Sequence, residues 1–438
     1  MNNNTEKPIM MVCIASGQTM QNLLPALYLN PVKLSVICSE NVKSTSSFEY
    51  LKRVIANITP NINVEKVNLS EESPNWEQVQ TFANPCFKHF KDKYNEFRLI
   101  LNITGGTKIM SASMLSSWQA LGLEAFYCHT GKTVTLEWLN QHKSTEQSFK
   151  QQSPLLNIEH YLNAHGYELI DKNWKNNHRA KVKQALKNKE ITHKLSNYAA
   201  KNSNEKNYFG KINTAAERKL NKNISPKEQQ KPISGALKND LLPLYQFLTK
   251  QQLLSYKEIN NNGKTFVEHQ FKDEATAKFL NGFWVEDYLT NILQELEQEN
   301  IIAPECWASG IKIKIEGSKD EYAQNELDVA ILSRNRLLII ECKSSHLENQ
   351  DPINKLLMLK EKGGGLFGEA WILSAKNPKQ EFVSRANVFK IKVFSMQAFT
   401  DIKQTLKAWV LGEKIQNSEE TDQPLNAMQL ALQKLQKQ

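Results

Sequence analysis

An aspartate, a glutamate and a lysine in the last third of the chain have a spacing that suits phosphodiester hydrolysis. Twelve residues separate Asp328 from Glu341, and Lys343 follows Glu341 by two positions. Carboxylate oxygens are preferred ligands of hard divalent cations such as Mg²⁺ or Mn²⁺. Such a cation activates water and polarises the phosphodiester, while an ammonium group stabilises developing negative charge. The pattern predicts that all three residues are catalytic and that Asp328 and Glu341 bind the metal.

Glu286 is a fourth candidate, because it lies on the apolar face of a segment with helical periodicity. Phe279, Phe283, Leu289 and Leu293 share that face. A carboxylate on an apolar face costs free energy unless it is paired or binds a cation. We therefore expect Glu286 to be catalytic and to complete the metal site, directly or through water. The alternative is a chance match, in which Glu341 and Lys343 form only a surface ion pair.

Regular elements around these residues indicate a mixed α/β domain over residues 266–412. Residues 272–299 have the pattern of one long helix. Residues 311–315 and 327–331 alternate apolar with polar side chains, which is typical of half-buried strands. Further strands are expected at 337–340, 370–373 and 388–393. This order places Asp328 and Glu341 on neighbouring strands of a restriction-endonuclease-like fold.

Two polar loops near the N-terminus have features of a phosphate-binding site. The run Thr-Gly-Gly-Thr-Lys at 104–108 follows an apolar strand and precedes a helix, and a second loop at 16–22 follows the first strand. Helix N-termini attract phosphate, glycine permits close backbone approach, and Thr and Lys add donors. Both loops are therefore candidate ligand-binding segments. The alternative is a plain glycine-containing turn.

Strand and helix patterns alternate through the region that carries these loops. Apolar strands are expected at 9–15, 34–38, 64–69, 99–103, 124–128 and 133–138, with helices at 23–27 and 109–121. Repeated strand–helix units indicate a Rossmann-like doubly wound sheet, in which loops at the carboxyl ends of strands meet at the ligand crevice. We therefore expect residues 1–150 to form a ligand-binding domain and both loops to contact one ligand.

Positive charge is concentrated between these two domains. The 438-residue chain has 55 Lys+Arg against 46 Asp+Glu, a formal net charge of +9. The stretch Lys172–Lys231 alone holds 16 basic and 4 acidic residues, a net of +12, so the remainder is slightly acidic. We expect residues 151–265 to be a basic connector with helices, and residues 413–438 to be a polar linker with a short helix. The connector either helps to retain a polyanionic substrate or is only a solvated spacer.

Several other classes of protein are disfavoured. No apolar run approaches the ~20 residues of a membrane helix, and no secretory signal pattern is present. The six cysteines form no CxxC pair, which favours a reduced, cytoplasmic compartment. No HExxH motif occurs, and no arginine has a histidine five positions later.

Two segments carry a resemblance to known families. The runs 271–286, Glu326-Leu327-Asp328 and 340–343 resemble the PD-(D/E)xK nuclease domain of CRISPR-associated effectors, although Leu327 stands where that family has proline. The run 102–110 resembles the signature of the CRISPR-associated Rossmann-fold sensor domain, abbreviated CARF. The resemblance implies a homodimer that is activated by a cyclic oligoadenylate, with cyclic tetra-adenylate favoured, and that then cuts RNA, DNA or both in type III CRISPR defence. The ligand-binding residues that it implies are Ser16, Gly17, Gln18, Thr19, Asn22, Asn102, Thr104, Gly105, Gly106, Thr107 and Lys108.

Two other functions stay open at this point. The nuclease fold could be a nucleic-acid clamp in a ligand-sensing regulator without cleavage. Alternatively, the chain could be a restriction or repair nuclease that ignores cyclic oligoadenylates. The residues leave the activator's ring size, the choice between RNA and DNA, the cut-site context and cleavage of the activator by the sensor undecided.

Overall fold

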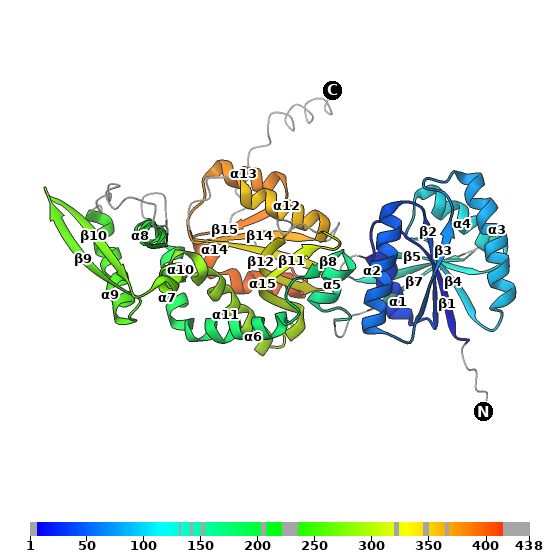
Figure 1. The fold of residues 1–438 in the computed structure, drawn as a ribbon, viewed down its shortest axis with the longest axis horizontal. Helices are drawn as coiled ribbons and strands as arrows, with labels where there is room; N and C mark the ends of the chain where they lie inside the picture. Colours follow the sequence, from blue (N-terminus) through cyan, green and yellow to red (C-terminus); the bar gives the residue numbers. More distant parts are fainter. Residues whose placement is uncertain are drawn as a thin grey trace, which may run out of the picture.

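The computed structural model describes residues 7–130, 133–140, 143–149, 154–202, 207–220, 235–318, 324–344, 350–363 and 368–414. Figure 1 shows an elongated molecule with an N-terminal α/β lobe, a second α/β lobe and a hairpin at the far end. The predicted C-terminal helix falls outside the described residues. Within the described ranges, no helix is long and apolar enough to cross a membrane.

The N-terminal lobe is a seven-stranded sheet with helices on both faces, as predicted. The strands run in the order β3-β2-β1-β4-β5-β6-β7. The first five in this order are parallel, and β6 and β7 are antiparallel additions. Their bounds are β1 Ile9–Ile14, β2 Lys33–Ser39, β3 Asn63–Leu69, β4 Arg98–Asn102, β5 Glu124–Thr130, β6 Val134–Asn140 and β7 Lys143–Phe149.

Alternation along β1 explains why helices cover both faces. Met11 and Cys13 pack in the core that includes helices α1 (Met20–Leu29) and α2 (Val42–Ile58). Met10 and Val12 pack in the core that includes α3 (Trp76–Lys93) and α4 (Lys108–Ala120). A strand buried on both faces reads as a continuous apolar run, which is how β1 appears in the sequence.

The second lobe has a six-stranded mixed sheet, also as predicted. Its order is β15-β14-β13-β12-β11-β8, with antiparallel pairing from β8 to β13 and parallel pairing from β13 to β15. Helices α11 (Trp284–Gln298) and α15 lie below the sheet in Figure 1, α14 lies at its left end, and α12 and α13 lie above it. The bounds are β11 Trp307–Ile315, β12 Gln324–Ser333, β13 Arg336–Lys343, β14 Glu369–Ser374, β15 Ile391–Phe394, α12 Asp351–Gly363, α13 Gln380–Val388, α14 Gln397–Thr400 and α15 Ile402–Leu411.

The expected single helix over 272–299 is wrong, because the chain kinks within it. Helix α10 (Glu274–Lys278) leads into the π-helical turn η1 (Phe279–Phe283), and α11 covers Trp284–Gln298. The backbone leaves helical geometry at Gly282, beside the end of β13. There the Ser344 hydroxyl donates to the Asn281 carbonyl at 2.5 Å. This contact holds the turn against the end of the strand that carries Glu341 and Lys343.

The predicted connector is largely part of the second lobe. Strand β8 (Tyr167–Leu169) pairs with β11, and helices α6 (Trp174–Lys187) and α7 (Lys189–Ala200) pack on α11. The packed face is made of scattered apolar residues among the lysines, and Trp174, Ala185 and Leu195 are all buried. These apolar residues are too few and too widely spaced among the lysines for the sequence to predict that the helices pack on the second lobe. The remaining helices of the described residues are α5 (Ile158–Ala164), α8 (Gly210–Leu220), α9 (Gly235–Lys250) and the short helix η2 (Pro304–Cys306).

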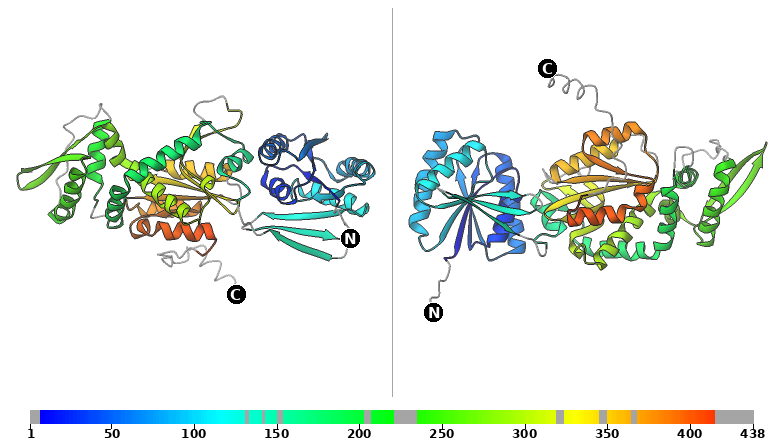
Figure 2. Two further views of the ribbon diagram at one scale, coloured as in Figure 1. Left: turned by 90° about the horizontal axis from the view of Figure 1, so that it is seen from below. Right: turned by 180° about the vertical axis from the view of Figure 1, so that it is seen from behind.

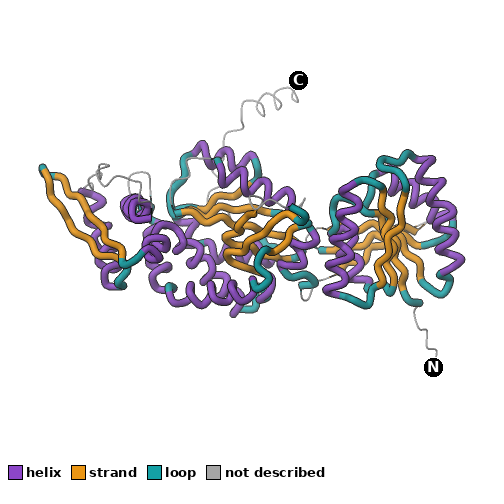
Figure 3. Tube along the Cα trace, in the orientation of Figure 1, coloured by secondary structure: helices purple, strands orange, loops and turns teal. Residues whose placement is uncertain are grey.

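Strands β9 (Leu254–Asn261) and β10 (Lys264–Phe271) form the hairpin, which the sequence analysis did not anticipate. Figure 3 shows it extending beyond the helices at the end opposite the N-terminal lobe.

A compact junction joins the two lobes. Arg53 of α2 makes a bidentate ion pair with Glu316, just after β11, at 2.7 and 2.6 Å. The Tyr50 ring lies against Gly166, where a Cβ atom would come within 2.7 Å of it. Gly166 also has a positive φ of +75°, which favours glycine. Figures 1 and 2 show α2 facing the second lobe at this point.

Candidate nuclease cleft and sensor loops

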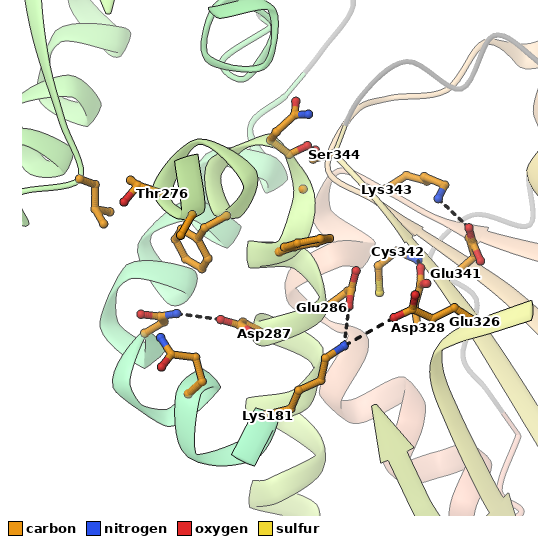
Figure 4. A pocket seen from close by; sticks show the side chains of 18 of the residues that line it. Lys181, Thr276, Glu286, Asp287, Glu326, Asp328, Glu341, Cys342, Lys343 and Ser344 are labelled. Atoms are coloured by element: carbon orange, nitrogen blue, oxygen red, sulfur yellow. Dashed lines mark hydrogen bonds and ion pairs between the residues drawn. The ribbon is translucent and has the colours of Figure 1, made fainter. Parts of the chain in front are cut away.

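One cleft of about 980 Å³ in the second lobe gathers all four predicted catalytic residues. Glu286 comes from the first turn of α11, Asp328 from β12, and Glu341 and Lys343 from β13. Figure 4 shows their side chains around a common space, with lysines interleaved between the carboxylates. Sequence spacing therefore identified residues that the fold brings together from three elements.

Asp328 and Glu341 lie on adjacent antiparallel strands and are mostly buried. One Asp328 oxygen, Oδ2, accepts a hydrogen bond from the Cys342 backbone N–H at 2.8 Å. Burial raises the pKa of Asp328 to about 6, and the charge of Glu341 adds to the rise. Two carboxylates this close repel each other, so a positive charge between them would be stabilised.

Two lysines form ion pairs with the Glu341 carboxylate. Its Oε1 accepts from Lys343 Nζ at 2.6 Å, and its Oε2 accepts from Lys355 Nζ at 2.7 Å. Burial alone would lower the pKa of Lys343, but Glu341 and Asp328 outweigh it, so the pKa is raised. Lys343 is therefore a cation at neutral pH, which suits charge stabilisation rather than proton abstraction.

Glu286 approaches the cleft from the opposite wall. Burial, together with the charge of Asp328, raises the pKa of Glu286 to about 7. Its Oε2 accepts from Lys181 Nζ at 3.4 Å, and the same ammonium lies 4.0 Å from Oε1 of Glu326. Such a large upward shift marks a buried carboxylate whose charge is incompletely balanced, as is typical of functional sites.

The donor set fits a hard divalent cation, although it is not a preformed cage. The three carboxylates offer oxygen ligands only, which Mg²⁺ and Mn²⁺ prefer. Ion pairs to lysines hold the oxygens of Glu286 and Glu341 as they stand. In the described part of the chain, no three His, Cys, Asp or Glu side chains form a ready ligand group. The predicted metal ligands Glu286, Asp328 and Glu341 therefore stay a prediction.

Sequence reasoning missed five charged residues of the cleft: Lys181 on α6, Asp273 at the N-cap of α10, Asp287 on α11, Glu326 on β12 and Lys355 on α12. No catalytic spacing of their own marks these residues. Glu326 stands two positions before Asp328, and Lys181 lies within the basic stretch. Their positions depend on how separate helices pack on the sheet, which local spacing does not report.

In the N-terminal lobe, the two predicted loops lie side by side. They follow β1 and β4, which pair directly at the point where the strand order reverses. Asn102 donates to the Gln21 carbonyl at 2.9 Å and to Oδ1 of Asn22 at 3.0 Å. Asn22 in turn donates to the Ile14 carbonyl at 2.8 Å. This is the crevice position that doubly wound sheets use for ligands.

The glycines of the second loop are fixed by close packing. A Cβ atom on Gly105 would lie 2.0 Å from the Ile14 carbonyl oxygen, and one on Gly106 would lie 2.6 Å from the Ile14 side chain. Thr107 caps α4 by accepting from the Met110 N–H at 3.2 Å. The loop backbone is thus held tightly against β1 while α4 begins beside it.

The predicted ligand residues divide into two groups by exposure. Gly17, Thr107 and Lys108 are exposed, and Ser16, Gln18, Thr104 and Gly106 are half-buried. Thr19, Asn22, Asn102 and Gly105 are buried, so their geometry suits holding the loops better than touching a ligand. Thr19, for example, shares a hydrogen bond with Ser47 of α2 at 3.2 Å. Direct contact with a ligand stays a prediction for all of these residues.

Comparison with protein families decides what these two lobes are. Residues 10–161 match the Card1 CARF domain, and residues 273–412 match the Card1-like endonuclease domain. The chain therefore combines a CARF domain with a Card1-like endonuclease domain. This confirms the predicted resemblance to a CARF sensor fused to a nuclease and the predicted α/β fold class.

Two solved structures share the fold over nearly their whole length. Protein VC1899 from Vibrio cholerae is 19% identical with a TM-score of 0.65, and the match covers 92% of this chain and 98% of that one. Can2 from Sulfobacillus thermosulfidooxidans, solved in complex with cyclic tetra-adenylate, is 19% identical with a TM-score of 0.61, covering 92% and 99%. No curated protein matched the sequence.

Proposed function

We propose that this protein is a metal-dependent nuclease of type III CRISPR antiviral defence, switched on by a cyclic oligoadenylate. Cyclic tetra-adenylate is the favoured activator, and RNA, DNA or both are the substrates. The observation that carries the proposal is the cleft, in which Glu286, Asp328, Glu341 and Lys343 meet within an endonuclease domain. A CARF domain on the same chain supplies the sensor.

The cleft residues divide the work of hydrolysis. Glu286, Asp328 and Glu341 would hold Mg²⁺ or Mn²⁺, which would activate water and stabilise charge on the phosphate. Lys343, whose raised pKa keeps it protonated, would neutralise the pentacovalent phosphate as charge builds up. The Cys342 N–H donates to Oδ2 of Asp328 and so fixes the position of this carboxylate in the lining of the cleft.

Aromatic side chains at the mouth of the cleft favour a single-stranded substrate. Phe279 and Phe283 of the π-helical turn both line the cleft, and Phe283 is 55% exposed. Unpaired bases stack on exposed aromatic rings, whereas bases in a duplex are already stacked. We therefore propose flexible single strands as substrates.

The sensor side of the proposal is a homodimer that binds one activator. In a doubly wound sheet, the crevice beside the strand-order reversal binds nucleotides, and the loops 16–22 and 104–108 flank it here. That Can2 was solved with cyclic tetra-adenylate supports the choice of activator. Activation requires the ligand to bind the cutting-competent form more tightly than the resting form.

One experiment tests both halves. Labelled single-stranded RNA and DNA are incubated with the protein and Mn²⁺ or Mg²⁺, with cyclic tri-, tetra- or hexa-adenylate in parallel. We expect cleavage only with metal and with one ring size, cyclic tetra-adenylate. No cleavage under any condition would sink the proposal. Equal cleavage without activator would favour a ligand-independent nuclease, and retention of substrate without cutting would favour a nucleic-acid-binding regulator.

A further inference from the structure

Lys181 belongs to the basic stretch between the domains, yet its ammonium group lies against the carboxylates of the nuclease cleft. Nζ is 3.4 Å from Oε2 of Glu286 and 4.0 Å from Oε1 of Glu326. Figure 4 shows the side chain crossing from α6 to reach both acids. In a basic segment that served only as a solvated spacer, the lysine side chains would extend into solvent instead.

Specific contacts fix the helix that carries Lys181. Nearly one turn earlier, Nδ1 of His178 accepts from the Ser309 backbone N–H at 3.3 Å, and the His178 ring packs edge-on against Trp307, with centroids 4.4 Å apart. Burial lowers the pKa of His178 to about 4, aided by Arg179 and Lys181, so the ring is neutral and can accept. Further along, Asn188 donates to Asp287 of α11 at 2.8 Å.

A glycine in strand β11 also leaves the space that the Lys181 side chain occupies. Gly310 of β11 has a φ of +64°, and a Cβ atom there would come within 1.7 Å of Lys181 Nζ. Gly310 lies between the ladder pairs Ser309–Val329 and Ile311–Leu327, and so sits beside Asp328. Any other residue at this position would occupy the path of the lysine. The anchored helix and the glycine gap are independent features that place one ammonium group at the same acids.

We propose that Lys181 is a positioning residue of the nuclease site, the resident counter-ion of Glu286 and Glu326 that a divalent cation displaces on binding. The inference deepens the proposed function and rests on it. Glu286 and Asp328 are buried near each other, and their mutual repulsion needs a nearby positive charge. A metal ion and an ammonium group that neutralise the same carboxylate compete, so the lysine must loosen its hold as the cation enters.

Binding of Mn²⁺ alone, without activator or substrate, tests the inference by calorimetry on the full chain. Removing the competitor in Lys181→Met should tighten Mn²⁺ binding by about two- to fivefold, since a partly exposed ion pair is lost. Lys181→Arg should behave as the wild type. Lys183→Met is the matched control, because Lys183 is an exposed lysine two positions along the same helix and does not line the cleft.

Thermal unfolding with and without Mn²⁺ provides the second measurement. Lys181→Met should melt earlier than the wild type without Mn²⁺, and the Mn²⁺-induced rise in melting temperature should be larger in the variant. Equal or weaker Mn²⁺ binding in Lys181→Met would overturn the role of Lys181 and leave the nuclease proposal standing. If neither protein binds Mn²⁺, the metal-dependent nuclease falls and the inference falls with it.

Discussion

The sensor loops and the nuclease cleft are built from opposite kinds of group. Neutral amides and backbone carbonyls knit the sensor loops together, with Asn102 bonded to Asn22 and Asn22 bonded to the Ile14 carbonyl. The cleft is made of charges, with Glu341 between Lys343 and Lys355. A ligand of the loops meets a neutral, hydrogen-bonded frame beside the exposed lysines Lys43 and Lys108, whereas a ligand of the cleft must rearrange ion pairs. Function should therefore depend on backbone shape in the sensor and on charge in the cleft.

The largest effect is expected in the cleft. Glu341→Gln preserves the shape of the side chain but removes the anion that a metal requires, so cleavage should fall on the order of 10³-fold. Activator affinity should be unchanged, because Glu341 lies in the other domain. Cleavage assays and calorimetric titration with cyclic tetra-adenylate measure the two quantities. Cleavage within tenfold of the wild type would remove Glu341 from the catalytic set.

In the sensor, shape should matter more than charge. Gly105→Ala places a methyl group 2.0 Å from the Ile14 carbonyl oxygen, so the loop must move. We expect a loss of about 1–3 kcal/mol in the free energy of unfolding and an activator requirement raised on the order of 10²-fold. Gly17→Ala is the matched stability control, since its nearest contact would be Lys43 at 3.7 Å. Equal stability of the two variants would contradict the packing argument.

A smaller effect is expected for the exposed charge of the sensor. Lys108 lies at the start of α4 with its side chain in solvent, so Lys108→Ala should leave folding intact. Losing one charge-assisted contact to a phosphate should weaken activator binding about tenfold. Mn²⁺ binding to the cleft should not change. Lys88→Ala, which removes another exposed lysine of the same domain, serves as the control. An equal loss of activator affinity in both variants would mean that only the net charge of the domain matters, and that Lys108 makes no specific contact.

The sequence was most informative where one element carries the signal. Glu341 and Lys343 share a strand, and Thr107 caps a helix, so local spacing correctly predicted where these residues lie in the fold. It failed where separate elements must pack, as with Lys181 and Lys355, which reach the cleft from α6 and α12. The same limit applies to the buried Asn102, because spacing cannot tell whether a polar residue at the end of a strand contacts a ligand or another loop. Its side chain bonds to the first sensor loop, and its contact with a ligand stays a prediction.

The link between the two regions should give the smallest effect. Helix α2 touches the first sensor loop through Ser47 and Thr19, and the second lobe through Arg53 and Glu316. Glu316 directly follows β11, whose neighbour β12 carries Asp328. Arg53→Met should leave the affinities for activator and Mn²⁺ unchanged. It should reduce activator-dependent cleavage a few-fold, because the free energy of a partly exposed ion pair is small.

A double-variant cycle makes this prediction specific to the pair. If Arg53 acts through Glu316, then Arg53→Met combined with Glu316→Gln should be no worse than either single change, because the interaction can be lost only once. Additive losses would mean that the two side chains act separately. Loss of Mn²⁺ affinity in Arg53→Met would mean that the junction supports the structure of the cleft, and the sensor and cleft would then be one mechanical unit rather than two coupled ones.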